Sequence, residues 1–80
     1  MSAHVAIRQR LTDGIVILDF LDPMTYGGTA MWTRTRLRKR VKCAVTGVPL
    51  QPGDLAYRPL GNMMYRSRRI AADVIDGAVE

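Results

Sequence analysis

Two stretches near the start of the chain carry the residue pattern of β-strands. Residues 4–11 alternate weakly between apolar and polar side chains, and residues 15–20 are rich in β-branched and aromatic side chains. Such side chains favour a strand because they pack well on a pleated surface. The residues between the two stretches, Thr12, Asp13 and Gly14, are typical of a tight turn. The pattern predicts an N-terminal β-hairpin.

A third, longer strand is predicted at residues 29–42, after a loop at residues 22–28 that contains one proline and two glycines. Threonines alternate with arginines from Thr33 to Arg36, which favours a strand over a helix. Every second residue after Trp32 is a cation, and a strand turns these side chains to one side, together with the Trp32 ring. We refer to these cations as the cationic row: Arg34, Arg36, Arg38, Arg40 and Lys42. The opposite side is the better candidate for the core: Thr33, Thr35, Leu37, Val41 and Cys43.

The second half of the chain predicts two tight turns, a short strand and a helix. The turns at residues 46–47 and 52–54 precede a strand at residues 55–58, which Pro59 ends. Asn62 can cap a helix over residues 63–76, and Gly77 suits its C-terminal end. The apolar face of this helix should dock on the sheet: Ile70, Ala71, Val74 and Ile75, extended by Met63 or Met64. The expected fold is α+β, a single domain of residues 1–80 with a small, mostly antiparallel sheet of about four strands and one C-terminal helix.

The charges of the predicted helix run against its dipole. Three arginines lie in its first half, whereas two aspartates lie in its last turn: Arg66, Arg68 and Arg69 against Asp73 and Asp76. Helix stability prefers the reverse order by about 0.3–1 kcal/mol per charge. We therefore expect a partner or a tertiary contact to account for this order. If these arginines share a face with the cationic row, the two sets form one basic surface.

Positive charge is concentrated in the middle of the chain. The net charge is +5, but residues 32–69 hold ten of the twelve Lys and Arg residues and one acid, Asp54, which gives a local net charge of +9. The sequence pI is about 10.2. Such a chain is expected to meet nucleic acid, a nucleoprotein or an acidic protein surface. Trp32 could stack on a base beside the cations, or it could belong to the core.

The apolar stretches and the single cysteine bear on membrane binding and on the cellular compartment. The longest apolar stretch, residues 15–21, includes Asp19 and is far shorter than the roughly 18 residues needed to cross a bilayer. We therefore expect no membrane role. A single cysteine, Cys43, and no secretory n-region favour the cytoplasm. Cys43 is expected to be a buried thiol, with an intersubunit disulfide or a reactive thiol as the alternatives.

The residues needed for catalysis or metal binding are scarce. One cysteine and one histidine are too few for a zinc site within one chain, and no cofactor is expected. Cys43 with His4 as its base would lack an orienting carboxylate, so an enzyme is not expected. Residues 43–47 have the shape of a zinc knuckle in which Thr46 replaces the second thiolate, and a hydrogen-bonded turn explains this segment better.

Several short motifs occur in a distinctive order: residues 43–50 (Cys-Ala-Val-Thr-Gly-Val-Pro-Leu), 53–54 (Gly-Asp), 57–59 (Tyr-Arg-Pro) and 62–70. Their order and spacing resemble a family of short bacterial proteins known only as a domain of unknown function. The resemblance covers about residues 14–75, with Pro23, Tyr26 and Trp32 also at similar positions. It implies a bacterial setting, and it implies no activity, cofactor or catalytic residue.

These observations lead to two function hypotheses. The first is a non-enzymatic basic protein that engages nucleic acid or a nucleoprotein machine through the cationic row, the three arginines and Trp32. Small basic proteins of phages and mobile elements include inhibitors of CRISPR surveillance complexes, which this chain resembles in general character. The alternative is an adaptor or inhibitor that recognises an acidic protein surface. A homodimer fits this alternative because an 80-residue domain has a small core.

Overall fold

The computed structural model describes residues 3–21, 28–61 and 66–77. One antiparallel sheet has the strand order β1-β2-β3-β6-β7, a separate ribbon pairs β4 with β5, and one short helix follows. The elements are β1 (His4–Thr12), β2 (Ile15–Leu21), β3 (Gly28–Arg36), β4 (Val41–Lys42), β5 (Pro49–Leu50), β6 (Leu55–Pro59), β7 (Ile70–Ala71) and α1 (Ala72–Asp76). The α+β class and the antiparallel sheet are confirmed, but the described sheet has five strands rather than about four.

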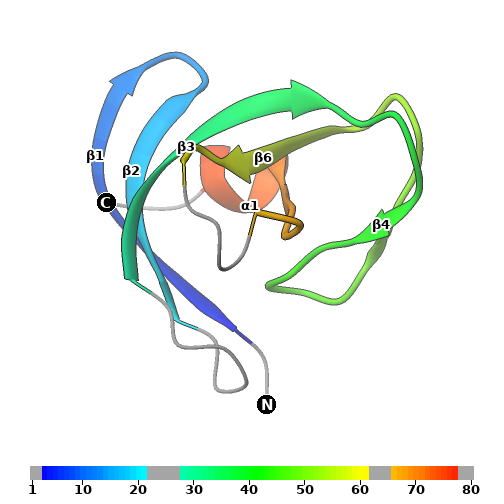
Figure 1. The fold of residues 1–80 in the computed structure, drawn as a ribbon, viewed down its shortest axis with the longest axis horizontal. Coiled ribbons are helices and arrows are strands. Elements are labelled where there is room, and N and C mark those ends of the chain that lie inside the picture. Colours follow the sequence, from blue (N-terminus) through cyan, green and yellow to red (C-terminus); the bar gives the residue numbers. More distant parts are fainter. Residues whose placement is uncertain (1–2, 22–27, 62–65, 78–80) are drawn as a thin grey trace.

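The sheet is curved, and α1 lies in its hollow (Figure 1). The inner face of the sheet carries most of the large buried side chains, because alternate residues of each strand point toward α1. Ile75 of α1 packs with them and is fully buried. Phe20 and Trp32 lie with their ring centroids 5.7 Å apart. The largest fully buried side chains are Val16, Leu18, Phe20, Trp32, Tyr57, Ile70 and Ile75.

The N-terminal hairpin is confirmed. β1 pairs antiparallel with β2 around a turn at Gly14, whose φ of 92° is a conformation that glycine adopts without a steric penalty. The Gly14 carbonyl accepts a hydrogen bond from the Arg34 amide at 2.8 Å, which fixes the turn against β3. Two register shifts interrupt β1, and such irregularities protect an exposed sheet edge from pairing with another chain.

The predicted third strand is wrong in its length and in its buried face. β3 ends at Arg36, because the chain turns at Leu37 and forms backbone hydrogen bonds with the segment before β6. The Leu37 amide donates to Asp54 at 2.9 Å, and its carbonyl accepts from Gly53 at 2.9 Å. The inner face of β3 carries Trp32, Arg34 and Arg36, since burial of the large Trp32 ring outweighs that of threonine methyl groups. The cationic row is therefore not formed as one strand face.

The predicted helix over residues 63–76 is also wrong in length. α1 begins at Ala72, and residues 62–65, with the proposed cap and two methionines, lie outside the described residues. Ile70 and Ala71 instead form β7, because the open edge of β6 offers backbone hydrogen bonds and the inner face buries Ile70 completely. Arg66, Arg68 and Arg69 therefore precede the helix, and their predicted conflict with its dipole does not exist.

The β4–β5 ribbon is connected by a hydrogen-bonded turn, as residues 43–47 suggested. The Cys43 amide donates to Val48, and the Gly47 amide donates to Cys43, both at 2.9 Å. Cys43 is a free, buried thiol whose sulfur accepts a hydrogen bond from the Ala71 amide at 3.3 Å. Burial raises the pKa of this thiol, but hydrogen bonds from Ala71 and Thr46 outweigh the effect and leave the pKa below its usual value. The ribbon is thus held against β7.

Candidate anion-binding cleft

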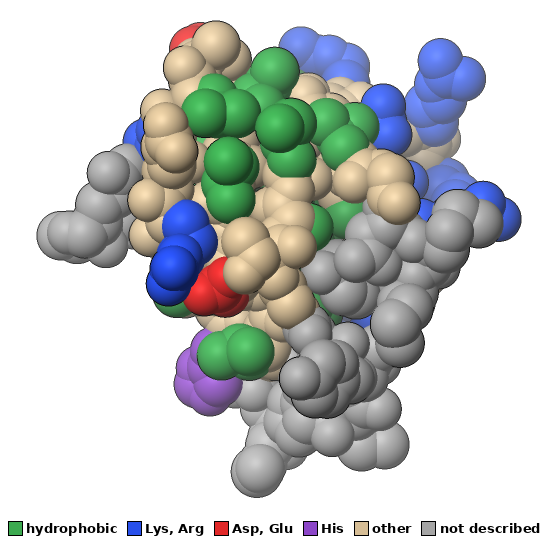
Figure 2. All heavy atoms as spheres, turned by 60° about the vertical axis from the view of Figure 1, so that its left-hand side comes forward, with side chains coloured by type: hydrophobic (Ala, Val, Ile, Leu, Met, Phe, Trp, Pro, Cys, Tyr) green, Lys and Arg blue, Asp and Glu red, His purple; other side chains and the backbone are tan. Residues whose placement is uncertain are grey.

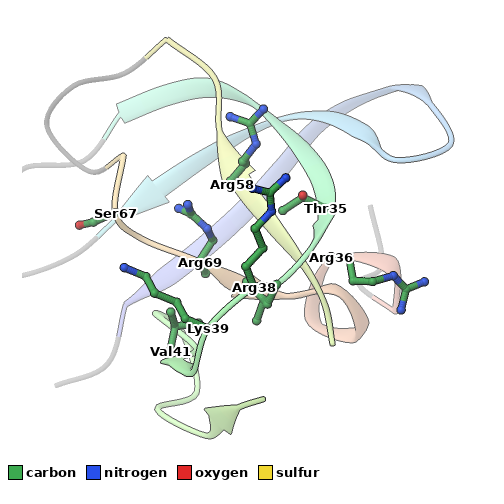
Figure 3. Close-up of a pocket in the computed structure, with 9 residues that line it drawn as sticks. Thr35, Arg36, Arg38, Lys39, Val41, Arg58, Ser67 and Arg69 are labelled. Atoms are coloured by element: carbon green, nitrogen blue, oxygen red, sulfur yellow. The ribbon is translucent and has the colours of Figure 1, made fainter. Parts of the chain in front are cut away.

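A cleft of 630 Å³ lies where β3, the loop after it, β6 and the segment before β7 come together (Figure 3). Arg58 faces this side because its neighbour Tyr57 points to the inner face, and successive strand residues point to opposite sides. Thr33, which is the register partner of Arg58, and Thr35 occupy the same outer face of β3. The described lining consists of Thr35, Arg36, Leu37, Arg38, Lys39, Val41, Arg58, Ser67 and Arg69.

Four cations reach this cleft from three separate segments. Arg38 and Lys39 belong to the loop between β3 and β4, Arg58 belongs to β6, and Arg69 forms an isolated bridge with Cys43 beside β7. Figure 3 shows that Arg36, although it also lines the cleft, points away from these four side chains. Its guanidinium donates to the Gly53 carbonyl at 2.8 Å, which explains that direction. We call the other four residues the cleft cations: Arg38, Lys39, Arg58 and Arg69.

Arg69 has a fixed position in the cleft. Its guanidinium donates to the carbonyls of Arg66 and Arg68 at 2.7 and 2.8 Å. The Arg69 carbonyl in turn accepts a hydrogen bond from the Ala44 amide at 2.8 Å. Burial and then the nearby charge of Arg58 lower the pKa of Arg69. The guanidinium groups of Arg58 and Arg69 are therefore close enough to repel each other.

The described lining contains no acid to offset this repulsion. Within the described part of the chain, Arg38, Lys39 and Arg58 form no salt bridge. Convergent cations of this kind create a positive potential, which attracts an anion and is neutralised by it. An arginine can bind phosphate oxygens through two parallel hydrogen bonds. The cleft is therefore suited to an anionic group rich in hydrogen-bond acceptors.

Arg34 lies on the other face of the sheet and has partners within the fold. Its guanidinium contacts the Asp13 carboxylate at 3.0 Å and the Asp76 carboxylate at 3.1 Å. These hydrogen bonds, Asp76 first and then Asp13, raise the pKa of Arg34. Asp76 therefore has the tertiary contact that its place in the predicted helix led us to expect. It pairs with Arg34 and accepts a hydrogen bond from the Tyr57 hydroxyl at 2.6 Å. Arg34 closes the turn of the hairpin against α1 and does not contribute to the cleft.

The aromatic rings of Trp32 and Tyr57 are both buried. Trp32 is fully buried, so its ring is not exposed for stacking on a base. Burial, and then the hydrogen bond to Asp76, raise the pKa of Tyr57 to about 12.

Two of the predicted cations, Arg40 and Lys42, are exposed but lie outside the cleft lining. Arg66 is exposed and Arg68 is half-buried, and the carbonyls of both accept from Arg69.

The structure therefore brings together only part of the predicted site. Arg36, Arg38 and Arg69, from the two predicted sets, do line one cleft, although Arg36 points away from the cleft cations. The sequence reasoning missed Arg58, Lys39, Ser67 and Thr35. The alternation Tyr57-Arg58-Pro59 within a short strand was the available signal, because it puts one cation opposite two buried residues. A strand that reached residue 42 would place Lys39 on the predicted core face beside Leu37 and Val41, but β3 ends at Arg36.

An apolar surface lies over β1, β2 and β3 on the outer side of the sheet (Figure 2). Ile17 pairs with Met31 across β2 and β3, and Ile15 pairs with Thr33. Leu11 and Met31 are 41% and 39% exposed, whereas Ile15 and Ile17 are half-buried. Arg8 and Asp19 lie 3.6 Å apart in an ion pair in which Arg8 is exposed and Asp19 is half-buried. We call this surface the apolar stripe: Leu11, Ile15, Ile17 and Met31.

Comparison with known proteins leaves the chain without an assigned relative: no family model, curated protein or solved structure matches it. The resemblance to a bacterial family of unknown function stays a prediction. The described residues contain no group of three His, Cys, Asp or Glu side chains placed to hold a metal ion. They also contain no helix with the length and apolar character that a membrane crossing requires.

Proposed function

We propose that this protein is a non-enzymatic, cytoplasmic binding protein that engages nucleic acid or a nucleoprotein machine through the cleft cations. One observation carries the proposal: four cations from three segments converge on one cleft whose described lining holds no acid. Placing them together costs electrostatic repulsion: burial and then the charge of Arg58 lower the pKa of Arg69. A phosphate chain offsets this cost and releases bound counterions as well.

Such binding suits a protein that acts by occlusion. A domain with extents of 29 × 27 × 24 Å covers a small part of a large nucleoprotein and needs no chemistry to block it. A CRISPR surveillance complex is one candidate target, because it exposes guide RNA and must bind DNA. Phage and mobile-element inhibitors of such complexes are the proposed functional class. The charge of this chain favours the phosphate-bearing surface as the point of contact.

The test is fluorescence anisotropy with labelled RNA and with single-stranded and double-stranded DNA at about 50 mM salt, where phosphate contacts are strongest. The Arg38→Gln/Arg58→Gln variant should lose most of the binding. Its matched control is Arg40→Gln/Lys42→Gln, which removes the same charge from exposed positions outside the cleft. Negligible binding of every nucleic acid by the unmodified protein would exclude direct nucleic-acid binding. Equal losses in both variants would show that net charge alone is responsible.

A protein target is the second candidate, because the apolar stripe occupies the same outer side of the sheet as the cleft. An acidic protein surface with an apolar centre would contact both. A homodimer formed through the stripe is one version of this candidate. Pull-down from a nuclease-treated bacterial lysate separates it from the first, since a protein target survives the nuclease. Sedimentation of the protein alone reports a homodimer.

A further inference from the structure

We infer that the cleft takes the sugar-phosphate backbone of a single nucleic-acid strand and does not read its bases. This inference rests on the proposed function and specifies its ligand. The argument has three parts: the hydrogen-bonding character of the lining, the location of the aromatic rings, and the size and shape of the cleft relative to a duplex.

The described lining offers donors almost exclusively. Its charged groups are guanidinium and ammonium groups, which donate and cannot accept. The hydroxyls of Thr35 and Ser67 are its side-chain acceptors. Arginine or lysine alone can read the two acceptors of guanine, but adenine and cytosine present donors to be recognised, so a site that distinguishes them needs amide or carboxylate side chains too. A phosphate presents acceptors alone. The lining therefore matches the backbone rather than the bases.

The described lining also contains no aromatic ring. Proteins that hold single strands through their bases stack those bases on exposed aromatic side chains. Trp32 is instead packed against Phe20 in the core, and the Tyr57 hydroxyl is bonded to Asp76. Neither ring reaches the outer face of the sheet. The described lining thus offers phosphate contacts, which every strand supplies regardless of its bases.

A duplex fits this cleft poorly. Duplex readers insert a helix or a β-ribbon into a major groove about 12 Å wide. In the described part of the chain, α1 has five residues and lies in the hollow of the sheet, while each strand of the β4–β5 ribbon has two. A cleft of 630 Å³ has the volume of a small-molecule pocket. One flexible strand can bend its backbone between the cleft cations, whereas a rigid duplex cannot.

The experiment compares labelled strands of about 12 nucleotides, a length within the range of small single-strand sites. The probes are oligothymidine, oligoadenosine, oligocytidine, a guanine-rich strand that does not self-pair, an abasic strand and a blunt duplex of equal length. Single strands, the abasic one included, should bind within about threefold of one another and at least about tenfold more tightly than the duplex. Four phosphate contacts predict a log–log salt slope of about −3, and Arg38→Gln/Arg58→Gln should make it shallower by about 1.4.

Each other outcome is decisive. Equal or tighter binding of the duplex overturns the inference and leaves the proposed function intact. A loss of about fivefold or more on removing the bases shows stacking, and a strong preference for the guanine-rich strand shows base reading by arginine, so either overturns it. Absence of binding to every probe overturns the proposed function and the inference together. Binding in which Arg40→Gln/Lys42→Gln changes the salt slope as much as the cleft variant places the strand elsewhere.

Discussion

The Tyr57 hydroxyl gives the most quantitative test of the structure. It donates to Asp76 at 2.6 Å from a ring that is almost completely buried. Tyr57→Phe removes this hydrogen bond and keeps the ring. A hydrogen bond to a charged group contributes about 1.5–3 kcal/mol, and we expect the lower end because Asp76 keeps its contact with Arg34. A loss of about 1.5 kcal/mol lowers the melting temperature of a domain of this size by about 6–12 °C.

The pH dependence of this loss is a sharper prediction. The fold raises the pKa of Tyr57 from 10 to about 12, so the neutral phenol is favoured in the folded state. The resulting stabilisation is fully present below pH 10 and is lost as the pH rises through 12. The folded protein therefore loses about 1 kcal/mol by pH 11 and about 2 kcal/mol by pH 12, relative to a variant without this hydroxyl. The stability curves of the natural protein and of Tyr57→Phe should therefore converge above pH 10 and cross between about pH 11 and 12.

The assay is urea unfolding followed by far-ultraviolet circular dichroism, at intervals from about pH 8 to 12. Circular dichroism is preferred because ionised tyrosine quenches tryptophan fluorescence. Other titrating groups are common to both proteins, so the difference in unfolding free energy isolates Tyr57. A difference that stays constant over this pH range, or a Tyr57→Phe variant as stable as the natural protein at pH 8, would refute the hydrogen-bonded arrangement.

Four further outcomes are expected. Arg34→Gln should lower the melting temperature because it breaks two ion pairs, whereas Arg40→Gln should leave it within error; equal effects would contradict the assignment of Arg34 to the fold. Gly77→Ala should cost about 1 kcal/mol in urea unfolding, because its Cβ would lie 2.9 Å from the Asp73 carbonyl, while Gly28→Ala, with no atom within 4 Å, should be neutral or slightly stabilising. Cys43, only 2% exposed, should react with a disulfide reagent at the rate at which the protein opens, and rapid labelling of the folded protein would disprove its burial. Trp32→Phe should lower stability but leave nucleic-acid affinity unchanged, so a selective loss of affinity would restore the stacking hypothesis.

Local patterns predicted the elements whose partners are close in sequence. The hairpin of β1 and β2 was predictable because its turn residues and its strand residues agree. The turn of residues 43–48 was predictable for the same reason. The length of β3 was not, since it depends on backbone bonds between Leu37 and residues 53–54, which no periodicity reveals. Likewise, Ile70 fits a helix stripe and a strand equally well, and the open edge of β6 decides between them.

The candidate site shows the same limit. Alternating cations form one row only under the assumption of one continuous strand. The bend after Arg36 leaves Arg34 and Arg36 on the inner face of β3 and puts Arg38 in the cleft. Arg34 could be recognised as structural only once Asp13 and Asp76, distant in sequence, were placed beside it. Arg58 became a site residue because the loop after β3 folds back toward it. Net charge thus leads only to an expected class of partner, while tertiary contacts decide which cations share the cleft.

The position of α1 has a consequence for how the domain is made. The Arg10 guanidinium, at the start of the chain, donates to the Ile75 carbonyl at 2.8 Å, across 65 residues of sequence. β7 also completes one edge of the described sheet, and α1 lies in the hollow of the sheet (Figure 1), where Ile75 is fully buried. During synthesis, the inner face of the first three strands therefore stays uncovered until residues 70–76 leave the ribosome. The interior of the sheet can consequently close only once these residues have been synthesised.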